Sequence, residues 1–223
     1  MFPSFVSFVS LLATLAVAPA TAAADPTAVD DDDDVGSPVA PSESIPSALK
    51  AFQATQDAVL AKVRKKAGDA AIEALVDTFL DYQWIAEQSL GGPGRYEKRC
   101  EPRCAEFEQL LGKLIRKNYL LRIHDADKGK IEYLGEEARK NGAKAKVDTL
   151  VTFKNTEGAQ QRVKVSYVMH WVDGKWMTRN IITDGVSLAK TYRYEFNKLL
   201  REGGIDRLIA QLEGQLAQLA QAK

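Results

Sequence analysis

Apolar side chains recur at helical spacing in five separate stretches of the chain. These stretches begin near Pro46, Asp69, Pro102, Ser187 and Ile205. We therefore predict five helices, the fourth capped by the Ser187 hydroxyl and ended by Gly203-Gly204. Residues 82–90 read as a short turn, and Gly91-Gly92-Pro93-Gly94 is a strong helix breaker.

Between the third and fourth helical stretches the apolar period changes from 3.6 to 2, which predicts strands. The predicted strands cover about 130–135, 145–154, 161–172 and 175–183. Asp173-Gly174 predicts a two-residue hairpin turn between the last two. Counting back from this turn pairs Met169 with Thr178, Tyr167 with Asn180 and Val165 with Ile182. The fold class is therefore α+β, with helices packed on one face of a curved antiparallel sheet of about four strands.

The N-terminus has the composition of an exported protein. Residues 1–24 carry no charged side chain, and small residues that fit an Ala-x-Ala cleavage site follow the apolar core. We predict a cleaved signal peptide over 1–24, with an uncleaved membrane anchor as the alternative. Residues 25–45 include the acidic run Asp30–Asp34 and three prolines or glycines soon after it, which predicts a disordered leader. One domain remains, over 46–223.

Charge divides unequally between these parts. The whole chain has 30 basic and 30 acidic side chains, but the first 45 residues hold seven acidic side chains and no basic ones. The predicted domain is therefore basic, with a net charge of +7. A basic domain favours anionic partners such as phospholipid headgroups, and export excludes nucleic acid as the partner.

The sequence carries no catalytic or metal-binding signature. It lacks a Gly-x-Ser-x-Gly elbow, a phosphate-binding glycine loop and a His-Glu-x-x-His motif. Cys100 and Cys104 predict a structural disulfide in an oxidising compartment, with free thiols or redox chemistry as the alternative. A zinc site would need further ligands, for which only His124 and His170 are available. We therefore expect no enzyme activity, no metal and no cofactor.

The C-terminal third contains three motifs in a fixed order. A strand leads into Asp184-Gly185-Val186-Ser187-Leu188, a Tyr192-Arg193-x-x-Phe196 helix follows, and Gly204-Ile205-Asp206-x-Leu208-Ile209 comes last. In this order the motifs resemble the MlaC family, also known as the toluene-tolerance auxiliary component. Upstream, Phe79 to Gly91 and the helix from Phe107 are also similar to the family, so the resemblance spans about 48–215. Asn180 stands where the family often has Asp.

The resemblance implies a soluble periplasmic phospholipid carrier, which serves outer-membrane lipid asymmetry and does no catalysis. It implies a fold related to nuclear transport factor 2 (NTF2-like) that encloses an apolar pocket for acyl chains. The implied partners are a phospholipid, an inner-membrane ABC-type lipid transporter complex and an outer-membrane lipoprotein complex. We expect the carrier to be a monomer.

Residues from the apolar helix stripes and from one face of the last two strands are the expected lipid-binding side chains, together with Arg193 from the matched helix. They are Leu75, Phe79, Phe107, Leu111, Val147, Val151, Phe153, Val165, Tyr167, Met169, Trp171, Trp176, Asn180, Ile182 and Arg193. Basic residues at the rim, such as Arg162, Lys164 and Lys190, are further candidates for contact with an anionic headgroup.

Two other functions remain open from the residues alone. The apolar side chains would pack as a dry core in a closed interaction module. In an enzyme on an NTF2-like scaffold, Asn180, Tyr167 and Thr178 would be the polar candidates, although they form no matched acid–base pair.

Overall fold

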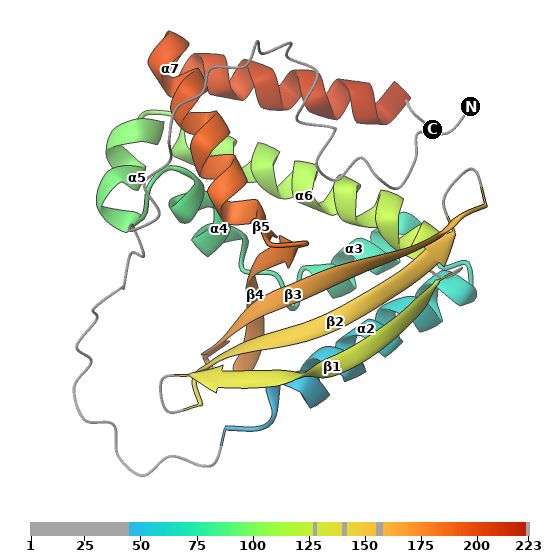
Figure 1. Ribbon diagram of the computed structural model, residues 1–223. Helices are drawn as coiled ribbons and strands as arrows, with labels where there is room; N and C mark the ends of the chain where they lie inside the picture. Colours follow the sequence, from blue (N-terminus) through green and yellow to red (C-terminus); the bar gives the residue numbers. More distant parts are fainter. Residues whose placement is uncertain (1–44, 127–128, 140–141, 155–157, 222–223) are drawn as a thin grey trace. The chain divides into compact units, whose positions relative to one another are not determined.

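A computed structural model describes residues 45–126, 129–139, 142–154 and 158–221 (Figure 1). The predicted signal peptide and residues 25–44 of the predicted leader lie outside the described residues. The helices are α2 (Ala48–Arg64), α3 (Asp69–Val76), α4 (Tyr82–Ser89), α5 (Pro93–Cys100), α6 (Cys104–Ala126) and α7 (Leu188–Gln221). The strands are β1 (Lys130–Arg139), β2 (Lys144–Lys154), β3 (Gln160–Val172), β4 (Lys175–Thr183) and β5 (Val186–Ser187).

One compact unit comprises Ile45–Phe153 and Gln160–Lys223. Its sheet follows chain order, β1-β2-β3-β4-β5, with each strand hydrogen-bonded to the next. The α+β class and the antiparallel meander predicted from the sequence are confirmed, and the two-residue β5 is added to the four predicted strands. No helix in the described ranges is long and apolar enough to cross a membrane.

The hairpin between β3 and β4 departs from the predicted register beyond the Met169–Thr178 pair. Trp171 opposes Trp176 and Met169 opposes Thr178, as the Asp173-Gly174 turn requires. A β-bulge then leaves Arg179 as an extra residue on β4, so that Tyr167 opposes Ile181 and Val165 opposes Thr183. The predicted pairs Tyr167–Asn180 and Val165–Ile182 are therefore wrong, because a count in steps of two cannot reveal an inserted residue.

The Arg179 side chain joins this bulge to α4 and to β3. Its Nε donates to Asp81 Oδ2 at 2.8 Å, its Nη1 lies 2.7 Å from His170 Nδ1, and its guanidinium lies over the Trp84 ring at 5.6 Å. Asp81 also caps α4 by accepting from the Trp84 backbone N–H at 3.1 Å. The region predicted as a short turn is thus a helix, α4. The Arg179 side chain connects this helix to the sheet.

Helix α5 was not visible in the apolar pattern, because only two of its eight side chains, Tyr96 and Cys100, are buried. The glycine-rich breaker before it does end α4, with Gly91 and Gly92 at φ values of 102° and 91°. A disulfide between Cys100 and Cys104 joins the end of α5 to the start of α6.

The start of α7 is held by two polar side chains. Ser187 Oγ accepts from the Lys190 N–H at 3.2 Å, as the N-cap prediction requires. Asn180 on β4 adds a second bond, accepting from the Ala189 N–H at 3.1 Å, and its Nδ2 donates to Ser187 Oγ at 2.9 Å. The predicted break occurs inside α7, where Gly203 and Gly204 leave helical geometry, Gly204 with a φ of 65°.

We predict that Asn180→Ala lowers the free energy of unfolding by about 1 kcal/mol, because the first turn of α7 loses a capping acceptor. Asn180→Asp keeps that acceptor and should recover most of the loss. Equilibrium urea unfolding of the two variants and the parent measures both effects. Equal stabilities for Asn180→Ala and the parent would contradict this role.

Candidate functional site

The apolar interior of the described residues is divided into two clusters. The helical cluster is built from all six helices, and its fully buried centre includes Val59, Ile72, Leu90, Phe107, Leu111 and Leu208. The sheet cluster lies between α2 and the sheet and consists of Ala48, Phe52, Ala145, Val147, Met169 and Trp176. Helix α2 contributes to both clusters, with Val59 in the helical cluster and Phe52 in the sheet cluster.

Aromatic rings fix the sheet cluster. The Phe52 ring of α2 lies 4.2 Å from the Tyr167 ring and 6.3 Å from the Tyr133 ring, measured between centroids. Trp176 packs edge to face with Trp171 at 5.6 Å, and its Nε1 donates to the Pro46 carbonyl at 2.8 Å. The start of α2 is thereby held against the sheet.

Five residues lie where the clusters adjoin, and we refer to them as the seam. They are Gln56, Phe79, Tyr119, Tyr167 and Thr178. Gln56 sits on α2 between Phe52 of the sheet cluster and Val59 of the helical cluster, and it is only 5% exposed.

The strand side of the seam connects both clusters through one residue. Thr178 opposes Met169 of the sheet cluster, and its N–H donates to the carbonyl of Phe79, in the helical cluster, at 2.7 Å. The Phe79 ring in turn lies 6.2 Å from the Tyr119 ring of α6.

Two hydroxyl groups at the seam are buried without a hydrogen bond of normal geometry, although the Gln56 side chain lies near one of them, Tyr119. Tyr119 Oη and Thr178 Oγ1 have no partner among the described residues. Burial and the nearby Tyr167 side chain raise the pKa of Tyr119, against the opposing effect of the neighbouring Gln56 side chain, and burial also raises the pKa of Tyr167. Because native proteins pair nearly all buried polar groups, two unpaired hydroxyls at one boundary mark a place where the interior lacks acceptors.

The predicted lipid-binding residues fall into three groups. Phe79, Phe107 and Leu111 lie in the helical cluster with Leu75 at its margin, and Val147, Met169 and Trp176 lie in the sheet cluster with Tyr167 and Trp171 at its margin. Six belong to neither cluster: Val151, Phe153, Val165, Asn180, Ile182 and Arg193. Asn180 serves instead as a cap for α7, and a lipid contact for any of these residues stays a prediction.

The residues of this region that sequence reasoning left out of the expected lipid-binding set include Phe52, Gln56, Tyr119, Tyr133 and Thr178. Phe52 and Tyr119 are visible in the apolar stripes of their helices, but periodicity does not say which surface a stripe meets. Gln56 is polar and gives no apolar signal at all.

At the rim, the predicted cation Lys164 is already engaged. Its Nζ lies 3.4 Å from Asp148 Oδ2, and Ser166 Oγ donates to Asp148 Oδ1 at 2.5 Å. Burial alone would raise the pKa of Asp148, but the Ser166 hydroxyl and the charges of Lys146 and Lys164 outweigh burial and lower this pKa. Arg162 and Lys190 are exposed, and Arg193 is half-buried. Within the described ranges, no three His, Cys, Asp or Glu side chains gather closely enough to hold a metal ion.

A family model for the MlaC protein matches residues 47–214. The chain belongs to the MlaC family. No curated protein matches this MlaC-family chain. A solved structure with a similar fold is the phospholipid-binding protein from Ralstonia solanacearum in complex with a phospholipid. The TM-score is 0.65 at 19% identity, over 78% of this chain and 99% of that one. At 19% identity this similarity shows the fold alone.

We predict that, in the delipidated protein, Thr178→Val raises the free energy of unfolding by about 1 kcal/mol, because it removes a buried hydroxyl that has no partner among the described residues. Thr149→Val is the matched control. Thr149 is also a fully buried strand residue, but its hydroxyl donates to the Val165 carbonyl at 2.9 Å. The control should therefore lose about 1 kcal/mol in the same urea unfolding measurement. Equal losses in both variants would show that the Thr178 hydroxyl has a partner.

Proposed function

We propose that this MlaC-family protein binds a phospholipid, with its acyl chains between the helical cluster and the sheet cluster, at the seam. The division of the apolar interior carries the proposal. A domain of this size usually has one contiguous core, whereas here two clusters adjoin at a boundary with unpaired hydroxyls. The family and the phospholipid bound to the structural neighbour support the same ligand.

Acyl chains suit such a boundary. Each buried methylene gains about 0.8 kcal/mol, and a chain between the clusters would contact apolar side chains on both sides. The hydroxyls of Tyr119 and Thr178 have no hydrogen-bond acceptor of normal geometry among the described residues. The ester carbonyls of a phospholipid would supply such acceptors. Of the predicted lipid-binding residues, Phe79 and Tyr167 lie at the seam itself, so we rank them first as contacts.

The proposal extends to transport through the periplasm, between an inner-membrane ABC-type transporter complex and an outer-membrane lipoprotein complex. Two chains of about 15 methylenes would gain about 24 kcal/mol gross. That exceeds the ceiling for non-covalent affinity near 20 kcal/mol, so much of the gain must be offset. Because a membrane buries the same chains equally well, we propose that the carrier exchanges lipid only when docked to a partner.

The contacts of the three polar side chains considered for catalysis support binding without catalysis. The Asn180 amide is occupied by the Ser187 hydroxyl and the Ala189 N–H. Thr178 Oγ1 has no partner among the described residues, so no base is positioned to activate it. The bulge also turns Tyr167 away from pairing with Asn180.

The direct test is extraction of the purified full-length protein with organic solvent, followed by mass spectrometry. We expect phospholipid in close to stoichiometric amounts, retained through gel filtration because the acyl chains are shielded. The protein after complete delipidation and refolding is the control for carried-over membrane. Protein purified under native conditions and free of lipid would overturn the proposal.

Tryptophan fluorescence tests the position of the chains. Trp176 lies in the sheet cluster and Trp171 at its margin, whereas Trp84 lies at the margin of the helical cluster, in contact with His170 on the face of β3 opposite Met169. Phospholipids brominated on their acyl chains quench only nearby tryptophans. We expect strong quenching in Trp84→Phe and weak quenching in Trp171→Phe/Trp176→Phe. Equal quenching in the two proteins would place the acyl chains elsewhere.

A further inference from the structure

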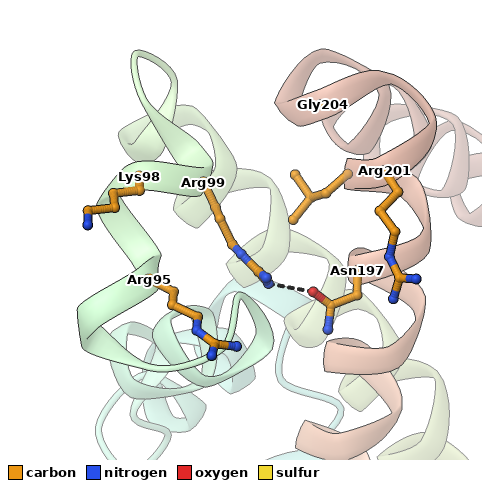
Figure 2. A pocket seen from close by; sticks show the side chains of 7 residues that line it. Arg95, Lys98, Arg99, Asn197, Arg201 and Gly204 are labelled. Carbon is orange, nitrogen blue, oxygen red and sulfur yellow. Dashed lines mark hydrogen bonds between the residues drawn. The ribbon is translucent and has the colours of Figure 1, made fainter.

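A second candidate site lies away from the seam, between α5 and α7. It is a pocket of about 500 Å³, lined on the α5 side by Arg95, Lys98 and Arg99. Asn197, Leu200, Arg201 and Gly204 of α7 complete the lining. Figure 2 shows Arg99 reaching from α5 toward Asn197, with Arg95 and Lys98 on the α5 side and Arg201 on the α7 side. We refer to it as the basic pocket.

The four cations of the basic pocket share one property. Among the described residues, none of Arg95, Lys98, Arg99 and Arg201 forms an ion pair with a carboxylate. Arg103, by contrast, has carboxylate oxygens of Glu106 and Asp206 within 2.7 Å. Four like charges around one pocket repel each other, and a bound anion offsets part of that repulsion.

Arg99 is held in place at the centre of this group. Its Nη1 donates to the Leu90 carbonyl at 2.9 Å and to Asn197 Oδ1. Burial lowers the pKa of Arg99, and the positive charges of Arg95, Arg193 and Arg201 lower it further. Arg193, expected to contact a lipid headgroup, thus contributes to the positive potential around Arg99. The remaining N–H groups of a fixed guanidinium are preorganised donors for an anion.

The backbone is shaped to admit these side chains. A Cβ atom on Gly91 would lie 3.3 Å from both Arg95 Cδ and Arg99 Nη1, and Gly91 has a φ of +102° that favours glycine. On the opposite side, Gly204 lines the pocket at the break in α7, three residues after Arg201.

We propose that the basic pocket binds a phosphate group that carries a net negative charge. Arginine guanidinium groups recognise phosphate oxygens through paired N–H donors, and three of the four cations here are arginines. The volume exceeds that of a phosphate ion, so the site has room for the organic part of a phosphate ester. The source is either an anionic lipid headgroup or a small phosphate ester in solution. Since the pocket and the seam share no residue, this proposal does not depend on the proposed function.

Isothermal titration calorimetry of the full-length protein with inorganic phosphate tests the site. The test variant is Arg95→Gln/Arg201→Gln, which removes two exposed cations of the pocket and leaves the hydrogen bonds of Arg99 intact. Lys113→Gln/Lys175→Gln removes two exposed cations elsewhere and is the charge-matched control. We expect the test variant to bind phosphate at least about tenfold more weakly than the parent, and the control to stay within about twofold.

Two results would overturn the proposal: no measurable phosphate binding by the parent protein, or equal weakening in the test variant and the control. Circular dichroism and urea unfolding establish that each variant is folded. If the double variant is unfolded, Lys98→Gln, at an exposed lining residue, replaces it in the same comparison.

Vesicles separate the two sources of phosphate. A lipid headgroup predicts cosedimentation with phosphatidylglycerol vesicles, little with phosphatidylcholine vesicles, and a loss specific to the test variant. A soluble phosphate ester predicts phosphate binding in the calorimeter with no vesicle binding that the test variant reduces. Since either pattern requires the pocket cations, both support the site and they differ only in its source.

Discussion

The backbone hydrogen bonds between Thr178 and the segment from Phe79 to Asp81 join the helices of this protein to its sheet. The Thr178 N–H donates to Phe79 O at 2.7 Å, and the Asp81 N–H donates to Thr178 O at 3.1 Å. The segment therefore extends the sheet beside β4 in parallel, at Leu80. Arg179, the next residue on β4, adds its side-chain bond to Asp81. These contacts join the helices to the sheet at a point other than the Asn180 cap, where β5 leads into α7.

This junction also explains why the apolar interior is split. Phe79 and Leu80 enter the helical cluster, while Met169, opposite Thr178, enters the sheet cluster. Thr178 stands between them with a polar side chain where a continuous core would have an aliphatic one. Replacing packed apolar atoms by an unpaired hydroxyl costs stability, and proteins retain such costs mainly where a site requires them. The same residues thus tie the two clusters together and keep them distinct.

The sequence predicted the strands, most helices and the α+β class because periodicity reports burial directly. It failed at Arg179 and at α5, for different physical reasons. The bulge at Arg179 inserts one residue without changing the local apolar pattern enough to be seen, and so Asn180 was expected in the lipid site instead of at the α7 cap. Helix α5 buries only Tyr96 and Cys100 and has no stripe. Gln56 and Thr178 of the seam were left out of the expected lipid site for a third reason, since they are polar and their burial depends on what surrounds them.

Helix α5 shows how a segment with little apolar surface is kept in place. Eight residues are too few for an independent helix, so its order depends on tertiary links. The Cys100–Cys104 disulfide fixes its end, Tyr96 Oη donates to Glu108 Oε1 at 2.7 Å, and Arg99 reaches back to Leu90. These links order a helix whose surface is mostly charged, and the side chains that gain a fixed position are the cations of the basic pocket. Holding like charges together works against stability, and therefore an anion that enters the pocket would strengthen the attachment of α5 to α7.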